Sequence, residues 1–361
     1  MDVPCVRVRP EHGETVRSRL ADADLIADEF EITVEDGWLY VPVAVQSGYS
    51  SEADDEGEAD DEGETDGESG RPVDALLSDL EDLEVDYALV DHDVPARDTQ
   101  TMPADLLGFE PSYERLGDTA LLEEDDPERA REIADAIVAS DLPLETVLNK
   151  ASKIKGETRV RDWDVVAGEG TTVVHREYGC EFALDLASVY FSPRLATERH
   201  RVVEQASEGE HVFDMFAGVG PFVIPFARGG AECVGVDVNE VAIEFLRANA
   251  DRNDVADRVT AIDADVREVA PEYEGWADRI VMNLPHSADA FLGSAVTIAG
   301  DDCVIHYYDI QHEDDPFGPG EQAIREAAEP DYEVTVETQR VVRSYAPHEL
   351  NVCLDVRLER R

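Results

Sequence analysis

The stretch H-V-F-D-M-F-A-G-V-G-P-F-V-I-P-F-A-R-G-G-A-E-C-V-G-V-D-V-N, residues 211–239, decides the fold. We predict a strand that ends at Phe213 and a turn from Asp214 to Gly220. A helix then begins at Pro221, because proline is tolerated in the first turn, where its missing N–H needs no partner. A second strand follows and ends in Asp237. This order predicts the first βαβ unit of a doubly wound α/β sheet, in which ligands bind beyond the carboxyl ends of the strands.

The turn also indicates which nucleotide is bound. Gly218 and Gly220 match the first two glycines of a dinucleotide motif, but Val223 stands where a third glycine would let a pyrophosphate approach. S-adenosylmethionine suits the pattern better, because it has a ribose diol and cationic groups but no phosphate. We expect Asp237 to bind the ribose, and Asp265, after the third strand, to bind the adenine amino group. The alternative is that both glycines are ordinary turn residues of another α/β protein.

The charge of the chain is strongly acidic. Asp and Glu total 84 and Lys and Arg total 30, so the net charge is −54, while 43% of residues are apolar. That apolar content argues against a disordered acidic protein. We interpret the charge as a halophilic adaptation to a cytoplasm of multimolar salt, where the Debye length is only about 3 Å. Because counterion release contributes little in such salt, the charge does not exclude an RNA partner.

Three segments follow from the composition. We predict a small N-terminal α/β domain at residues 1–110 and a middle α/β RNA-binding segment at 111–188. The cofactor-binding domain is predicted at 189–361. An acidic insertion at about residues 47–70 lacks large aliphatic side chains, and we expect it to be disordered. A helix is predicted at 76–83. In the middle segment, residues 116–122 are predicted to form one strand.

The cysteines do not indicate a metal site or disulfides. They are odd in number, widely spaced and without metal-ligand spacing: Cys5, Cys180, Cys233, Cys303 and Cys353. We expect buried thiols in a reducing environment. The sequence shows no signal peptide and no apolar run of membrane-spanning length. We therefore expect a cytoplasmic monomer without a membrane partner or a bound metal.

Two stretches before the cofactor strand suit a nucleic-acid substrate. Residues 150–161 contain five cations, a pattern that fits RNA phosphates, although a solvated strand face is the alternative. Residues 189–201 contain two aromatics, three arginines and Glu198. A predicted helix at 195–205 would place Glu198 near the transferred methyl group. The alternative is that Glu198 pairs with an arginine one turn away on an exposed helix face.

A substrate loop is expected after the fourth strand, which we predict at 280–282. There Asn283-Leu-Pro285 offers an asparagine amide and backbone carbonyls to an N–H in the plane of a base, and proline makes the turn rigid. Many amino-group methyltransferases place an aromatic ring after this proline, whereas here His286 follows. Two last strands, at 332–341 and 352–358, are expected to be antiparallel, as is usual in methyltransferases.

Together these motifs resemble the archaeal and eukaryotic family that methylates N1 of guanosine 37 in tRNA. The matching stretches are K-G-E-T-R-V-R (155–161), Y-F-S-P-R-L-A-T-E-R (190–199), F-D-M-F-A-G-V-G-P-F (213–222), G-V-D-V-N (235–239), N-L-P-H-S (283–287) and V-R-S-Y-A-P-H (342–348). The resemblance covers the chain from about Lys150 to its end. Before that, residues 1–110 fit the family's tRNA-docking domain in size and position only. The resemblance implies a Rossmann-like class I methyltransferase domain, preceded by small α+β tRNA-binding domains.

The resemblance also implies roles for individual residues. Glu198 would remove the proton from N1 of guanine, and Arg159 would stabilise the charge that moves toward O6. Asn283 and Pro285 would hold the guanine edge. The implied cofactor residues are Asp214, Phe216, Ala217, Gly218, Gly220, Asp237, Asp265, Asn283 and Arg199. The implied substrate residues are Tyr190, Arg194, Lys153, Lys155 and Arg161.

The implied cofactor is S-adenosylmethionine, and the implied partner is tRNA, bound at its anticodon region and outer corner. A magnesium requirement is consistent with the family, although the sequence shows no ligand set for it. Three alternatives stay open: an aminocarboxypropyl transferase for wybutosine precursors, a non-catalytic tRNA-binding protein, and a methyltransferase of free nucleotides. Gly-Pro-Phe after the second glycine and the Asn-Leu-Pro loop favour methyl transfer to tRNA.

Overall fold

The computed structural model describes residues 2–23, 25–44, 85–97, 100–153, 156, 160–329 and 331–361. The acidic insertion predicted at 47–70 and the helix predicted at 76–83 lie outside these residues. The chain forms two compact units, Met1–Gln100 and Thr101–Arg361, and each is described by itself. The three-segment division made from the sequence stays a prediction.

The first unit is an antiparallel sheet with a helix packed on it. Its elements are β1 (Asp2–Val8), α1 (Gly13–Asp22), β2 (Thr33–Glu35), β3 (Trp38–Pro42) and β4 (Tyr87–Asp93). The strand order is β2-β3-β1-β4. Asp36 and Gly37 join β2 to β3 with φ angles of 50° and 78°, which is the left-handed pair that suits a tight hairpin. Val16 and Leu20 of α1 pack with Val6 of β1 in the core.

The second unit begins with a small mixed sheet and a separate hairpin. Their elements are α3 (Pro103–Leu107), β5 (Glu114–Leu116), β6 (Thr119–Leu122), α4 (Pro127–Ala139), β7 (Thr146–Lys150), β8 (Trp163–Ala167), β9 (Thr172–Glu177) and β10 (Cys180–Asp185). The single strand predicted at 116–122 is wrong, because the chain reverses at Gly117, which has a φ of +60°, and β5 pairs antiparallel with β6. A Cβ at Gly117 would lie 2.3 Å from the Val174 carbonyl oxygen, so only glycine fits this turn.

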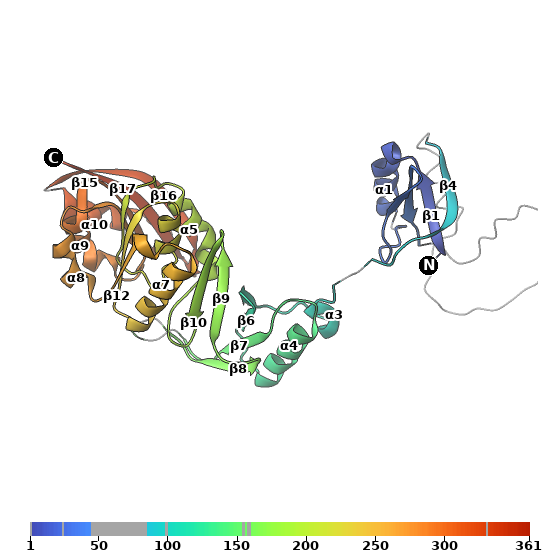
Figure 1. Ribbon diagram of the computed structural model, residues 1–361, viewed down its shortest axis with the longest axis horizontal. Helices are drawn as coiled ribbons and strands as arrows, with labels where there is room; N and C mark the ends of the chain where they lie inside the picture. The colour runs from blue at the N-terminus through green and yellow to red at the C-terminus, as the bar shows by residue number, and fades with distance from the viewer. Residues whose placement is uncertain are drawn as a thin grey trace, which may run out of the picture. The chain divides into compact units, whose positions relative to one another are not determined.

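A seven-stranded sheet forms the rest of the second unit (Figure 1). Its elements are α5 (Ala196–Val203), β11 (His211–Asp214), α6 (Val223–Arg228), β12 (Glu232–Asp237), α7 (Glu240–Arg252), β13 (Val259–Asp263), α8 (Val266–Val269), β14 (Ala277–Met282), α9 (Leu292–Ile298), β15 (Ala299–His312), α10 (Gly318–Ala328), β16 (Tyr332–Ala346) and β17 (Glu349–Arg360). The strand order is β13-β12-β11-β14-β15-β17-β16. Strands β11 to β15 are parallel, whereas β17 is antiparallel to both its neighbours. The doubly wound fold with antiparallel last strands is therefore confirmed.

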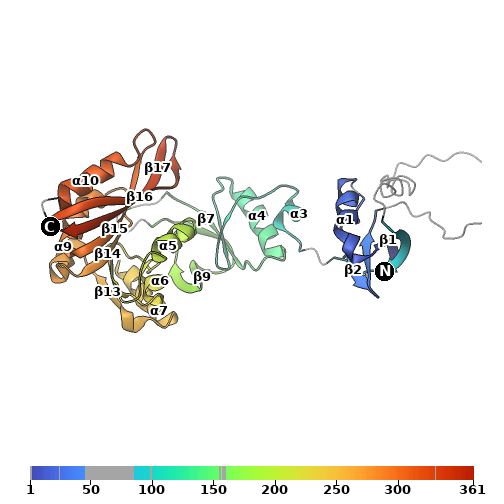
Figure 2. The ribbon, with the colours of Figure 1, turned by 90° about the horizontal axis from the view of Figure 1, so that it is seen from above.

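Each face of this sheet has its own core. Val212 of β11 belongs to the core with α5, α6 and α7, and its neighbour Phe213 belongs to the core with α8, α9 and α10. Successive side chains of a strand point to opposite faces, so the short apolar strand β11 contributes side chains to the cores on both faces of the sheet. Figure 2 shows α6 and α7 on one side of the strands and α9 and α10 on the other. Helix α6 begins at Val223, two residues later than predicted.

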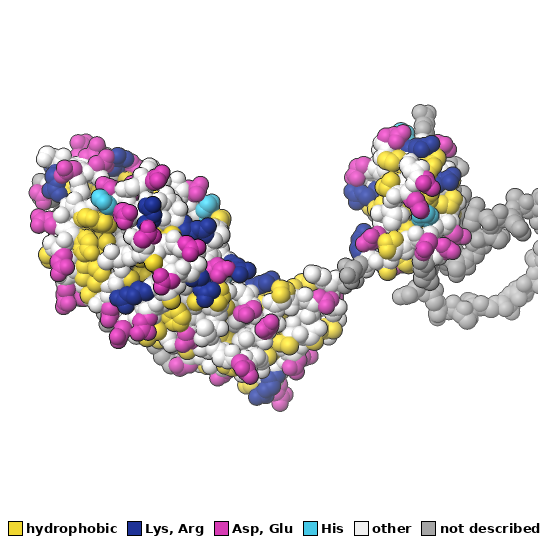
Figure 3. All heavy atoms as spheres, viewed as in Figure 1, with side chains coloured by type: hydrophobic (Ala, Val, Ile, Leu, Met, Phe, Trp, Pro, Cys, Tyr) yellow, Lys and Arg dark blue, Asp and Glu magenta, His cyan; other side chains and the backbone are white. Residues whose placement is uncertain are grey.

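Most of the described acidic residues lie on the surface of the protein, and the cysteines lie in its core. Acidic side chains are spread over the visible face of each unit and do not gather in one patch (Figure 3). All five cysteines are buried and free, as the sequence predicts. Within the described ranges, no helix combines the length and the apolar character needed to cross a membrane.

Candidate active site

A pocket lies at the carboxyl ends of the parallel strands, where the strand order reverses between β11 and β14. This is the place where doubly wound sheets bind ligands. The predicted site residues that line it are Tyr190, Arg199, Phe216, Ala217, Gly218, Asp237, Asp265, Asn283 and Pro285. The structure thus brings most of the predicted cofactor residues into one pocket with the predicted substrate loop.

Asp237 ends β12 and holds the glycine turn. Its Oδ2 accepts the Gly218 N–H at 2.8 Å, and its Oδ1 accepts the Asn239 N–H at 2.9 Å. Burial raises the pKa of Asp237, while these two backbone hydrogen bonds oppose the shift. Each carboxylate oxygen keeps a further lone pair, which can accept a hydrogen bond from a ribose hydroxyl.

Asp265 follows β13 and caps α8. Its Oδ1 accepts the backbone N–H of Arg267 at 2.9 Å, and the Arg267 side chain forms an ion pair with the same carboxylate. The hydrogen bonds from the Arg267 side chain hold the pKa of Asp265 below its usual value. Asp265 is therefore an ionised acceptor at the pocket wall, which suits an adenine amino group.

Two predicted cofactor residues, Asp214 and Gly220, do not line the pocket and instead support its turn. Asp214 is 1% exposed and accepts the Phe216 N–H at 3.1 Å. Burial raises the pKa of Asp214 to about 7. Gly220 has a φ of +90°, and a Cβ there would lie 2.4 Å from Leu246 Cδ1. Gly220 is thus required for close packing against α7.

Arg199 lines the pocket, and three of its five N–H groups donate to neighbouring residues. Its Nε and Nη2 donate to the Glu177 carboxylate at 2.7 and 2.6 Å, and its Nη1 donates to the Ser192 carbonyl at 3.1 Å. The guanidinium also lies 5.1 Å from the centre of the Phe191 ring. Arg199 therefore fixes the wall formed by residues 190–192.

A second pocket adjoins the first and shares four of its residues: Tyr190, Phe191, Ser192 and Arg343. Its charged lining residues are Lys150, Arg161, Arg194, Arg343, Glu114 and Glu123. Cations outnumber acids in this lining, in a chain where the reverse holds overall. A local excess of positive charge suits a phosphate-bearing ligand.

The predicted basic cluster is only partly visible in this pocket. Lys150 Nζ lies 2.7 Å from Glu123 Oε2, so that cation is already paired. Lys153 is exposed and lines neither pocket. Lys155 and Arg159 lie outside the described residues. The roles expected for these residues stay predictions.

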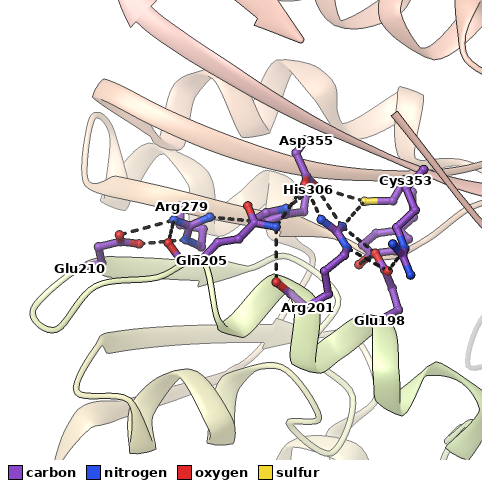
Figure 4. A network of polar contacts seen from close by, with 10 residues as sticks. Glu198, Arg201, Gln205, Glu210, Arg279, His306, Cys353 and Asp355 are labelled. Carbon is purple, nitrogen blue, oxygen red and sulfur yellow. Dashed lines mark hydrogen bonds and ion pairs between the residues drawn. The ribbon is translucent and has the colours of Figure 1, made fainter. Parts of the chain in front are cut away.

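Glu198 does not line either pocket. It is 4% exposed, and its carboxylate accepts from Arg201 at 2.7 and 3.0 Å and from the Tyr308 hydroxyl at 3.2 Å. Arg340 Nε lies 2.9 Å from its Oε2. The alternative interpretation, that Glu198 pairs with an arginine one helical turn away, is confirmed for Arg201. The exposed helix face that this interpretation assumed is wrong, because Glu198 points into the protein (Figure 4).

The Glu198 contacts belong to a longer buried network (Figure 4). Arg201 Nη1 lies 2.5 Å from Asp355, His306 Nδ1 lies 2.7 Å from Asp355, and Arg279 Nη1 lies 2.8 Å from His306 Nε2. Arg279 in turn pairs with Glu210 at 2.8 Å. Burial lowers the pKa of His306. The neutral ring then donates from Nδ1 to Asp355 and accepts at Nε2 from Arg279, which satisfies both nitrogens.

The same network contains a group with metal-ligand types, His306, Cys353 and Asp355. Arg201 Nη2 lies 3.5 Å from Cys353 Sγ and 3.2 Å from Asp355 Oδ1. A guanidinium thus already neutralises this group, and a metal cation would be repelled by it. We interpret the cluster as an ion-pair network.

Sequence reasoning missed the contribution of the last hairpin. Arg343, Tyr345 and Asn351 line the pocket, although none of them had been given a role. The stretch V-R-S-Y-A-P-H, residues 342–348, was an available signal. This stretch alone does not reveal the cross-strand register, which places Asn351 opposite Arg343.

The parallel sheet with its antiparallel last hairpin, and a pocket whose acidic walls suit a ribose and an adenine but no phosphate, define a class I S-adenosylmethionine-dependent methyltransferase. Family models agree: the TRM5/TYW2 methyltransferase domain matches residues 173–337, the TYW2 N-terminal domain residues 99–171, and the tRNA methyltransferase 5 N-terminal domain residues 5–47. The chain belongs to this TRM5/TYW2 family of tRNA-modifying enzymes.

Individual relatives show how far the similarity extends. The chain is 38% identical to the tRNA (guanine(37)-N(1))-methyltransferase Trm5b of Pyrococcus abyssi, over 98% of each chain. A solved structure of aTrm5 in complex with tRNALeu has a TM-score of 0.69 and 30% identity, and the match covers 98% of this chain and 99% of that one. The tRNA(Phe) (4-demethylwyosine(37)-C(7)) aminocarboxypropyltransferase of Pyrococcus horikoshii is 35% identical over 72% of this chain and 94% of its own.

Proposed function

We propose that this protein transfers the methyl group of S-adenosylmethionine to N1 of guanosine 37 in tRNA. The observation that carries the proposal is the similarity to Trm5b over 98% of both chains, the N-terminal unit included. The aminocarboxypropyltransferase aligns with 72% of this chain while using 94% of its own length. Since residues 5–47 match the N-terminal domain of tRNA methyltransferase 5, this comparison favours methyl transfer.

The pocket fits the cofactor in its donor and acceptor chemistry. Asp237 would accept hydrogen bonds from the ribose diol, and Asp265 would accept from the adenine amino group. The backbone of Phe216 to Gly218 would lie along the ligand. A phosphate-bearing cofactor would meet these carboxylates with like charge. When bound, S-adenosylmethionine supplies an electrophilic methyl group.

The guanine N1 proton must leave as the methyl group arrives, and Glu198 is our candidate for the base. Its carboxylate is covered in this structure, so at least one donor must move before it can reach a substrate. Arg340 is the best candidate to move, because its side chain is 45% exposed, compared with 19% for Arg201. Arg159 is proposed to stabilise O6.

Asn283 and Pro285 are proposed to hold the base. The Pro285 carbonyl accepts the Ile310 N–H at 3.0 Å, which ties the loop to β15. Arg161 and Arg194 of the second pocket would bind tRNA phosphates. The cytoplasmic location, the monomeric state and the contacts with the anticodon region and outer corner are part of the proposal, but a magnesium ion is not.

The test is a methyl-transfer assay in concentrated potassium salt with unmodified tRNA transcripts that carry G37 or A37, followed by nucleoside mass analysis. We expect N1-methylguanosine from the G37 transcript alone. An aminocarboxypropyl mass on a modified tRNA, without methylguanosine, would assign the protein to the other branch of the family. Methylation of free guanosine but not tRNA, or tight cofactor binding without any product, would overturn the substrate assignment.

A further inference from the structure

Two buried polar atoms without partners belong to the last hairpin. Arg343 on β16 and Asn351 on β17 face each other in the strand register, and both line the pocket at the strand ends. Among the described residues, Arg343 Nε and Asn351 Oδ1 find no hydrogen-bond partner, although Asn351 is only 4% exposed. Buried polar groups in proteins are nearly always paired, so an unpartnered donor and an unpartnered acceptor on paired residues of one pocket indicate a ligand.

The pair lies at the substrate end of the pocket. Asn351 is also in register with Ile310 of β15, and the Ile310 N–H donates to the Pro285 carbonyl at 3.0 Å. Arg343, Asn351 and Ile310 thus form one row across β16, β17 and β15. The Ile310 end of this row contacts the Asn283-Leu-Pro285 loop. Arg343 lines the second, cation-rich pocket as well, whereas the cofactor carboxylates line only the first.

An aromatic ring stands next to this pair. Tyr345 lines the pocket and is 42% exposed, and its hydroxyl lies 3.0 Å from Nε2 of His286, the residue that follows Pro285. The two rings are 5.2 Å apart at 72°, an edge-to-face contact. The aromatic ring that many amino-group methyltransferases place after this proline is thus available from β16, and His286 orients it.

We propose that the last hairpin holds and identifies the target base: Tyr345 stacks on guanine, Asn351 Oδ1 accepts from its 2-amino group, and Arg343 Nε donates to O6. This inference rests on the proposed function. The 2-amino group and O6 flank N1, so contacts on both sides orient N1 toward the methyl group. Adenine has neither group, and the pair therefore selects guanine.

The test pairs one variant with one altered base. A transcript with inosine at position 37 keeps N1–H and O6 but lacks the 2-amino group. We expect the wild type to methylate the G37 transcript with a kcat/KM about tenfold to a hundredfold above that for inosine, the range of one good base contact. Asn351→Ala should reduce this ratio to near one and bind S-adenosylmethionine as the wild type does. Val341→Ala, at a 46% exposed position of the neighbouring strand β16 outside both pockets, should keep the full ratio.

Two further variants separate base reading from folding. Arg343→Ala should lower kcat/KM about tenfold or more on both transcripts alike, because both carry O6. Tyr345→Phe should preserve the KM for tRNA, while Tyr345→Leu should raise it about tenfold, since only the former keeps a stacking ring.

The outcomes distinguish the two proposals. A wild type that makes no methylguanosine from any tRNA refutes the proposed function itself. A wild type that methylates G37 without preference over inosine, or a folded Asn351→Ala protein that keeps the full preference, refutes the reading of the 2-amino group. Loss of cofactor binding in Asn351→Ala would assign that residue to the cofactor instead.

Discussion

Arg340 Nε lies 2.9 Å from Glu198 Oε2, so a residue of the last hairpin covers the carboxylate that we propose as the base. The other partners of Glu198 are more deeply buried, because Tyr308 is 1% exposed and the Arg201 side chain is 19% exposed. The Glu198 carboxylate is therefore bonded to two more deeply buried donors, Tyr308 and Arg201, and to one more exposed cation, Arg340.

Replacing Arg340 should not slow the chemical step. If Arg340 must leave Glu198 before proton transfer, Arg340→Ala should show a single-turnover rate at least equal to that of the wild type at saturating tRNA and cofactor. Arg201→Ala is the comparison, because it leaves Glu198 and Asp355 buried without their shared cation, and it should lower both the rate and the melting temperature. Equal rate losses in the two variants would show that Arg340 positions the carboxylate and does not cover it.

Glu198→Gln should separate catalysis from binding. The amide cannot take the N1 proton, so turnover should fall by about 10²- to 10⁴-fold, the usual contribution of a positioned base. The dissociation constant for S-adenosylmethionine, measured by calorimetry, should stay unchanged because Glu198 does not line the pocket. The matched control is Glu204→Gln, at a 68% exposed side chain just after the same helix. Parallel losses of turnover and cofactor affinity would remove Glu198 from the mechanism.

Asp237→Asn should weaken cofactor binding more than turnover. The amide loses the charge and turns an NH₂ group toward one of the N–H donors of Gly218 and Asn239. We expect the dissociation constant for S-adenosylmethionine to rise about tenfold to a hundredfold, the loss typical of a charged hydrogen bond. Asp263→Asn, an exposed carboxylate at the end of β13 that does not line the pocket, is the control. If both variants bind equally well, the ribose assignment is wrong.

Asp214 should make the protein less stable as the pH rises toward neutrality. Burial, with a smaller contribution from the charge of Asp237, raises the pKa of Asp214 from 3.8 to about 7. Between these values the native state holds a proton that the unfolded state has lost, so this group lowers stability as pH rises through the window and adds no further change above it.

Asp214→Asn removes that titration. The variant should gain up to roughly 4 kcal/mol in the free energy of unfolding at pH 8, and the gain should shrink as the pH falls toward 4. Denaturant unfolding at both pH values in constant high salt measures it. A gain that does not depend on pH would mean that folding does not raise the pKa of Asp214.

The pocket residues that we assign to the cofactor could be predicted to lie together because their determinants are local. Gly218 and Asp237 are 19 residues apart, and both belong to one βαβ unit whose strand and turn signals are contiguous. The reversal at Gly117 was missed although Gly117-Asp118 is a turn signal, because the strand before it, β5, has only three residues. The partners of Glu198 and the pairing of Arg343 with Asn351 depend on how distant strands align. Local patterns of apolar residues do not encode that alignment.

The ion pair between Arg201 and Asp355 spans 154 residues of sequence. During synthesis on the ribosome, the cofactor turn and its first strands are complete well before β17 emerges. Asp355, the anion that Arg201 meets outside its own helix, is in place only once that last strand has paired with β15. A nascent chain is thus able to form the turn between β11 and α6 before α5 is fixed against β17, and the fold is complete only with the final strand.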